Sequence, residues 1–112
     1  MSDLDRTLSA LADPTRRRVV ELLHEKPRRA GELAASLKMR GPAMSRHLKV
    51  LRTSGLIEED HQGDDARVRL YRLRAEPFRG LRGWLDEVET FWSRELRAFK
   101  DYAERTRGRP RR

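Results

Sequence analysis

Residues 41–56, GPAMSRHLKVLRTSGL, are the segment that most constrains the fold of this chain. Met44, Leu48 and Leu51 have the spacing of an amphipathic helix, which predicts one face buried in a core. Pro42 suits the first turn of such a helix, and Gly55 suits the left-handed position that ends one. The other side carries only hydroxyl and cationic side chains: Ser45, Arg46, Lys49 and Arg52.

Acidic residues are excluded from this helix and from the residues around it. No Asp or Glu occurs between Leu33 and Ile57, although the chain contains 18 acidic residues. A basic helix face is often only solvated. Because this is the longest stretch of the chain without a carboxylate, the pattern favours a polyanionic partner.

The neighbouring segments complete a helix-turn-helix followed by a wing. Residues 30–41 predict a short helix and a tight turn. Residues 57–61 and 67–73 predict two strands around the turn-forming residues 62–65. The runs ADPTRRRVVELL, GELAASL and MSRHLKVLRTSGLI make the chain resemble the ArsR/SmtB family of winged-helix repressors. This resemblance covers the chain from about Leu8 through the wing and the last helix.

The expected fold is mainly α with a small β-hairpin. We predict a dimeric winged helix-turn-helix of about five helices plus a two-stranded wing. Asp13 and Pro14 have the sequence of a helix start, as cap and first helical residue. Residues 1–104 are expected to form one DNA-binding and dimerisation domain, and residues 105–112 a disordered, arginine-rich tail.

The last helix, expected from Pro77 to about Thr106, has a broader apolar stripe than a small domain needs. One interpretation is a helix packed only on its own domain. The favoured one is that part of this stripe packs against a second copy, because an exposed aromatic patch of this size is otherwise a liability. The resemblance implies the same, since the first and last helices form the homodimer in that family. The candidate interface residues are Leu4, Leu8, Leu85, Val88, Phe91, Trp92 and Phe99.

The resemblance also implies that the basic helix enters the major groove of double-stranded DNA. It places Pro42, Ala43, Ser45, Arg46 and Lys49 at or near base edges and phosphates, with Arg52 as a further phosphate contact. The fork of Arg46 fits guanine O6 and N7. His47 has two open interpretations, a DNA contact or a hydrogen-bonding residue that faces the first helix of the motif.

Three arginines flank these predicted contacts. Arg40 stands where the family commonly has a capping Ser or Thr, so Gly41 is expected to cap the helix while Arg40 reaches a phosphate. Arg67 and Arg69 on the wing either contact DNA or pair with carboxylates across the hairpin.

The wing and the tail depart from the usual pattern of the family. Glu58, Glu59 and Asp60 would repel phosphate, so the usual wing contact is not expected. Arg107 and Arg109 lie in the sequence RGRP, which resembles the core of an AT-hook that enters the minor groove. A non-specific electrostatic tail is the favoured interpretation of these arginines, and the minor-groove arm is the alternative.

Composition excludes several other classes of protein. The net charge is +8, falling to +3 without the five arginines of residues 105–112. Without cysteine or paired histidines, the chain is not expected to bind a metal ion. The resemblance matches the thiolate ligands of metal-sensing relatives to Arg29, Gly31 and Ala34, which cannot ligate a metal. No nucleophile–base pair indicates an enzyme, and no cofactor is expected. Lacking a signal peptide or membrane span, the chain is expected to be cytoplasmic.

The predicted function is a homodimeric, sequence-specific transcriptional repressor that reads a palindromic operator. Two alternatives are a winged-helix protein-interaction module and an architectural DNA binder that uses the basic tail. The sequence does not identify the operator, the regulated genes or an inducer.

Overall fold

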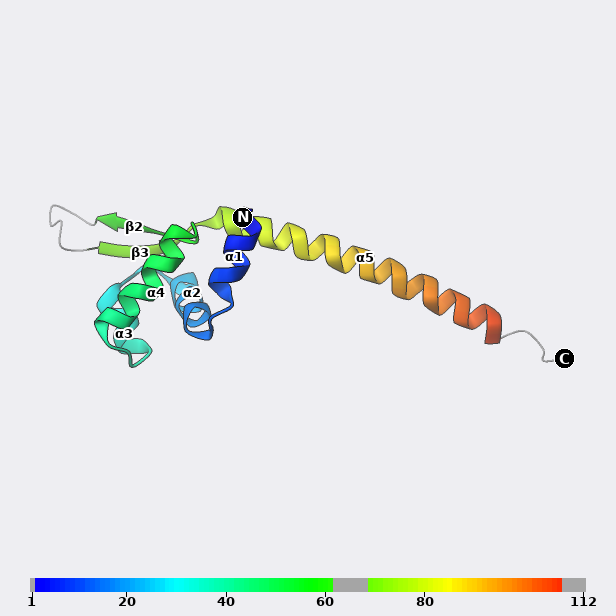
Figure 1. The fold of residues 1–112 in the computed structure, drawn as a ribbon, viewed down its shortest axis with the longest axis horizontal. Coiled ribbons are helices and arrows are strands. Elements are labelled where there is room, and N and C mark those ends of the chain that lie inside the picture. The colour runs from blue at the N-terminus through cyan, green and yellow to red at the C-terminus, as the bar shows by residue number, and fades with distance from the viewer. Residues whose placement is uncertain (1, 62–68, 108–112) are drawn as a thin grey trace. The chain divides into compact units, whose positions relative to one another are not determined.

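The computed structural model describes residues 2–61 and 69–107. The chain divides into two compact units, residues 1–80 and 81–112. The elements along the chain (Figure 1) are α1 (Asp3–Leu11), α2 (Pro14–Glu25), β1 (Arg28–Arg29), α3 (Ala30–Ser36), α4 (Gly41–Thr53), β2 (Ile57–His61), β3 (Arg69–Leu73) and α5 (Ala75–Arg107). The mainly helical fold with a helix-turn-helix and a hairpin is therefore confirmed.

The core of the first unit lies where α2, α3 and α4 meet the sheet. Helix α4 contributes three side chains at the spacing that the sequence indicated, and each is at most 2% exposed. Tyr71, Leu73 and Phe78 pack against this core from β3 and the start of α5. The buried apolar residues are Ala10, Val19, Leu23, Leu33, Ala34, Met44, Leu48, Leu51, Leu56 and Ile57.

Helix α1 buries its small residues rather than its leucines. Thr7 and Ala10 are 2% and 1% exposed, whereas Leu8 is 38% exposed. The Thr7 hydroxyl donates to the carbonyl oxygen of Asp3 at 3.0 Å, so its burial leaves no unpaired polar group. The helix thus approaches the core closely and leaves Leu8 at the surface.

The sheet contains one more strand than the sequence predicted. Its order among the described residues is β1-β3-β2, and all pairs are antiparallel. The added strand β1 is only Arg28–Arg29, which pairs with Tyr71 and Leu70 of β3. In the hairpin, Glu59 lies opposite Tyr71 and His61 opposite Arg69.

The start of α4 corrects one prediction. Gly41 is the first helical residue and Arg40 is the N-cap, so the expected cap at Gly41 is wrong. Arg40 makes no side-chain cap bond, and its carbonyl oxygen accepts the backbone N–H of Met44 at 3.0 Å. Arg40 has the extended backbone that an N-cap residue requires, and Pro42 still falls within the first turn of α4.

Helix α5 is longer at both ends than the sequence indicated. It begins at Ala75, two residues before Pro77, and it includes residues 105–107, which were expected in a disordered tail. Arginine is a good helix former, and Arg105 and Arg107 complement the dipole of the last turn. No helix in the described residues is both long and apolar enough to cross a membrane.

Candidate nucleic-acid interface

Helix α4 separates a core face from a polar face. With roughly 100° of rotation per residue, Arg46 and Lys49 point almost opposite to the buried Met44. Ser45 and Arg52 lie together on one flank of the polar face. All four polar side chains are exposed, as the sequence predicted, because the three buried residues fix the rotation of the helix.

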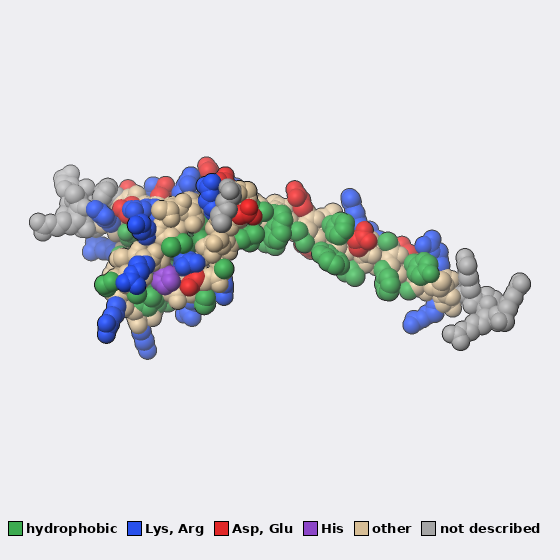
Figure 2. Space-filling model, viewed as in Figure 1, with side chains coloured by type: hydrophobic (Ala, Val, Ile, Leu, Met, Phe, Trp, Pro, Cys, Tyr) green, Lys and Arg blue, Asp and Glu red, His purple; other side chains and the backbone are tan. Residues whose placement is uncertain are grey.

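The basic residues gather around the helix-turn-helix. Figure 2 shows lysine and arginine side chains over α3 and α4 in the first unit. Arg40 and Pro42 are exposed at the start of α4, and Ala43 is half-buried. Within residues 2–61 and 69–107 no ion pair neutralises Arg40, Arg46 or Lys49. The outward part of α4 therefore presents positive charge that solvent alone balances.

The turn between α3 and α4 fixes how α4 is presented. Helix α3 ends in a Schellman arrangement, in which the backbone N–H of Met39 donates to the carbonyl oxygen of Ala34 at 2.9 Å. Lys38 occupies the left-handed position of that motif with φ of 53°. At the other end, the N–H of Leu56 donates to the carbonyl oxygen of Leu51 at 3.0 Å, and Gly55 has φ of 82°.

His47 is half-buried and lies towards the body of the protein. The pKa of Asp13 is lowered, mainly because its carboxylate accepts the backbone N–H of Arg16, with a smaller contribution from His47. The half-buried position is that of the inward interpretation, but the described residues contain no hydrogen bond from the His47 side chain. The helix start beside it belongs to α2, however, and not to the first helix of the motif.

Arg52 is held by the wing rather than left in solvent. Its guanidinium pairs with the carboxylate of Glu59 on β2, which Arg69 approaches at 3.7 Å. The Tyr71 hydroxyl donates to the same carboxylate at 3.3 Å. Burial raises the pKa of Tyr71, with a further contribution from the charge of Glu59, so the phenol stays protonated as a donor. We call Arg52, Glu59, Arg69 and Tyr71 the Glu59 cluster.

Sequence reasoning found only part of the Glu59 cluster. Cross-strand pairing of Arg69 was one of its two interpretations, and the structure contains that pair. The pairing of Arg52 with Glu59 was missed, because it joins a helix to a strand seven residues later. The hairpin register, which places Glu59 opposite Tyr71, was the signal that could have revealed a half-buried, hydrogen-bonded carboxylate.

A second set of ion pairs lies on the other face of the hairpin. Arg72 pairs with Glu58 at 2.8 Å and with Asp60 at 3.4 Å. Successive residues of a strand point to opposite faces, so these residues are separated from Glu59. The predicted residues Arg67 and Arg109 lie outside the described residues, and Arg107 is the last residue of α5.

The second unit presents an apolar helix face (Figure 2). Phe91, Trp92 and Phe99 are 59%, 58% and 71% exposed, and Leu85 is 50% exposed. Val88, at the centre of the predicted stripe, is half-buried. On α1 of the first unit, Leu4 is half-buried and Leu8 is exposed.

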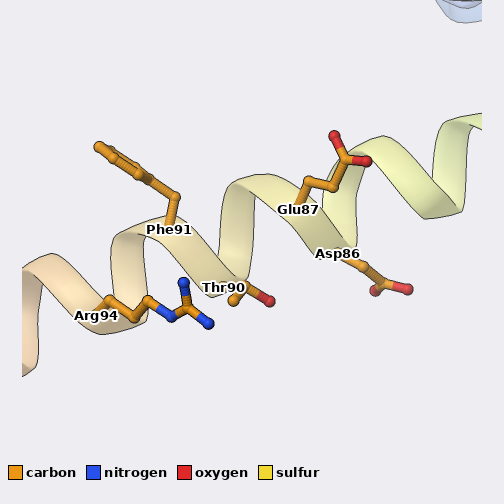
Figure 3. Close-up of a pocket in the computed structure, with 5 residues that line it drawn as sticks. All are labelled: Asp86, Glu87, Thr90, Phe91 and Arg94. Atoms are coloured by element: carbon orange, nitrogen blue, oxygen red, sulfur yellow. The ribbon is translucent and has the colours of Figure 1, made fainter.

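A shallow depression also lies on α5 (Figure 3). Its lining belongs to a single helix, and Phe91 and Arg94 extend from it in different directions. The described residues contain no group of three or more His, Cys, Asp or Glu side chains that could hold a metal ion. The depression is lined by Asp86, Glu87, Thr90, Phe91 and Arg94.

Comparisons with known proteins agree with this arrangement. Residues 13–59 match the family described as bacterial regulatory protein, arsR family. Over 95 residues the chain is 42% identical to the HTH-type transcriptional regulator Rv2034 of Mycobacterium tuberculosis. That alignment covers 85% of this chain and 83% of the relative.

Solved structures show the same fold. The ArsR-like transcriptional regulator from Rhodococcus sp. RHA1 is similar with a TM-score of 0.75 and 28% identity, over 90% of this chain and 92% of that chain. The homodimeric winged helix-turn-helix DNA-binding domain of Mb0332 from Mycobacterium bovis is similar with a TM-score of 0.61 and 25% identity, over 79% of each chain. The chain belongs to the ArsR family of bacterial transcriptional regulators, whose members bind DNA and are not enzymes.

Proposed function

We propose that this protein is a homodimeric, cytoplasmic repressor that binds a palindromic DNA operator with one α4 helix in each of two major-groove half-sites. Residues 1–104 would form the DNA-binding and dimerisation domain, and the arginines of residues 105–112 would add sequence-independent attraction. Repression is the expected direction of regulation, because the sequence resembles a family of repressors.

The exposed cationic face of α4 is the observation that carries this proposal. Arg46 and Lys49 are exposed on a helix whose other face is at most 2% exposed, so the core fixes their direction. A helix of 13 residues fits the major groove, where arginine reads guanine and lysine contacts phosphate. The DNA contacts assigned to Pro42, Ala43 and Ser45 follow from the same placement.

Dimerisation is supported by the apolar side chains of α5. Phe91, Trp92 and Phe99 are each more than half exposed, and a second copy of the same helix would bury such side chains by symmetry. Two copies would also supply the two recognition helices that a palindrome requires. The relative from Mycobacterium bovis is a homodimer, which supports the same assembly here.

The test measures how tightly the protein of 112 residues binds each of two DNA duplexes. One duplex is selected from randomised DNA by repeated binding, and the other is an unselected mixture of equal length. Fluorescence anisotropy titrations at about 50 and 200 mM salt should show the selected duplex binding on the order of 1,000-fold more tightly than the mixture. Both affinities should fall as the salt concentration rises.

Two other outcomes would contradict the proposal. Equal affinity for both duplexes would identify an architectural binder that recognises the phosphate backbone. No binding to either duplex at low salt would identify a protein-interaction module. A selected sequence with two inverted half-sites about one helical turn apart is the result expected of the dimer.

A further inference from the structure

Glu59 is placed unlike the other carboxylates of the wing. Its side chain is 15% exposed, whereas those of Glu58 and Asp60 are 45% and 51% exposed. One carboxylate oxygen accepts from Arg52 and from the Tyr71 hydroxyl, and the other faces Arg69. Glu59 is therefore mostly shielded from solvent, and two guanidinium groups pair with its carboxylate.

Those two guanidinium groups remain accessible to a second anion. The Arg52 and Arg69 side chains are 48% and 56% exposed although both approach Glu59. A guanidinium has five N–H donors, so one carboxylate does not exhaust it. Phosphate and carboxylate have matching geometry for this group and compete for the same donors.

The position of Arg52 connects this competition to DNA binding. Arg46, Lys49 and Arg52 recur every third residue along α4, so they follow one side of the helix. Lys49 has no ion pair within the described ranges, whereas Arg52 is paired. Of the cations along this side, the one nearest the wing is thus partly neutralised by the protein itself.

We propose that Glu59 sets the strength of phosphate-backbone binding: it holds Arg52 and Arg69 and thereby limits the sequence-independent affinity of the protein for DNA. This inference rests on the proposed DNA-binding function. Phosphate contacts strengthen binding to every sequence equally, whereas base contacts distinguish sequences. A carboxylate that competes with DNA for two cations weakens the phosphate contacts and leaves the reading of bases by Arg46 intact.

The direct experiment compares Glu59→Gln with Glu58→Gln. Both substitutions remove one negative charge per protomer and keep the shape of the side chain. Glu58 serves as the matched control because its partner Arg72 is on the opposite face of the hairpin. Glutamine at position 59 retains an acceptor for Tyr71, and circular dichroism and thermal melting show whether each variant is folded.

Glu59→Gln should bind the unselected duplex at least threefold more tightly than Glu58→Gln at about 50 mM salt. Its plot of log K against log salt should be steeper by roughly 2 to 4 per dimer, because one or two arginines per protomer gain a phosphate. Affinity for the selected duplex should rise by the same factor, so the ratio of the two affinities stays unchanged. Equal slopes for the two variants, or weaker binding by Glu59→Gln, would overturn the inference.

A second comparison does not require a substitution at Glu59. In the otherwise wild-type protein, Lys49→Ala should reduce the slope of log K against log salt concentration by about 2 per dimer. Arg52→Ala should flatten it by less than half of that amount, because Glu59 already holds Arg52. Equal flattening by both would overturn the inference even if Glu59→Gln fails to fold. Failure of the wild-type protein to bind either duplex would instead overturn the proposed function itself.

Discussion

The guanidinium Nε of Arg16 donates a hydrogen bond of 2.7 Å to the main-chain carbonyl oxygen of Ala10. Arg17 donates in the same way to the carbonyl oxygen of Leu11 at 2.8 Å. The last carbonyl groups of a helix have no partner within the helix, and α1 has no basic residue in its last turn. The first turn of α2 therefore supplies the cations that cap α1.

We predict that Arg16→Ala lowers the free energy of unfolding by about 1–2 kcal/mol, because it leaves the carbonyl oxygen of the buried residue Ala10 without its charged donor. Urea denaturation monitored by circular dichroism measures the change. Arg18→Ala is the matched control, since Arg18 pairs only with the exposed Glu21 at 3.7 Å. The control should cost no more than about 0.5 kcal/mol. Equal effects from the two variants would show that Arg16 does not act as a cap.

Helices α3 and α4 both end in a Schellman motif, at Lys38 and Gly55 respectively. Introducing glycine at the first position and removing it from the second are predicted to have opposite effects on stability. Lys38 and Gly55 both have positive φ, and only the first carries a side chain that disfavours it. Lys38→Gly should raise the free energy of unfolding by up to about 1 kcal/mol, and Gly55→Ala should lower it by about 1–2 kcal/mol. A Cβ at Gly55 would also come within 3.4 Å of the Arg74 guanidinium. Urea denaturation of both variants checks the signs, and a destabilised Lys38→Gly protein would contradict the first.

Local patterns in the sequence were enough to identify the helices and their buried faces. Met44, Leu48 and Leu51 carry that information in their spacing, and Asp13 followed by Pro14 marks the start of α2. Strand β1 was missed because Arg28–Arg29 has no strand pattern and exists only through its pairing with β3. Pairing across the fold is not encoded in any short window of sequence.

The exposed residues of the candidate site and the pairing of Arg69 across the hairpin were among the predictions, but the ion pair of Arg52 with Glu59 was not. Exposure of Arg46 and Lys49 follows from helical periodicity alone. The neutralisation of Arg52 depends on how β2 lies beside the last turn of α4, which only the folded chain defines. The cap at Gly41 was wrong because residue preference at the N-cap is weaker than the backbone geometry that places Arg40 there.

The proposed dimer predicts a linked loss of assembly and DNA binding. Trp92→Glu places a charge within the apolar face of α5, so it should give monomers in sedimentation or light-scattering measurements. Operator affinity should fall with it, because a monomer has one recognition helix for two half-sites. Val88→Glu should act in the same way, and Thr90→Glu, about half a turn away, is the control expected to remain dimeric.

A Trp92→Glu monomer that binds the selected duplex with wild-type affinity would contradict this prediction. Loss of dimerisation by Thr90→Glu as well would show that any added charge on α5 prevents assembly. In that case the apolar face would not be the determinant of the dimer.

The central claim is that α4 reads base sequence through Arg46, and the most direct measurement is the discrimination between selected and unselected duplexes by Arg46→Ala. We predict that this substitution lowers discrimination by about 1–3 kcal/mol per half-site, as expected for one bidentate contact to guanine. Lys49→Ala, three residues along the same face, should weaken binding to both duplexes equally and reduce the salt dependence. If Arg46→Ala weakens both duplexes equally as well, Arg46 contacts only phosphate and the proposed reading of the major groove by α4 is contradicted.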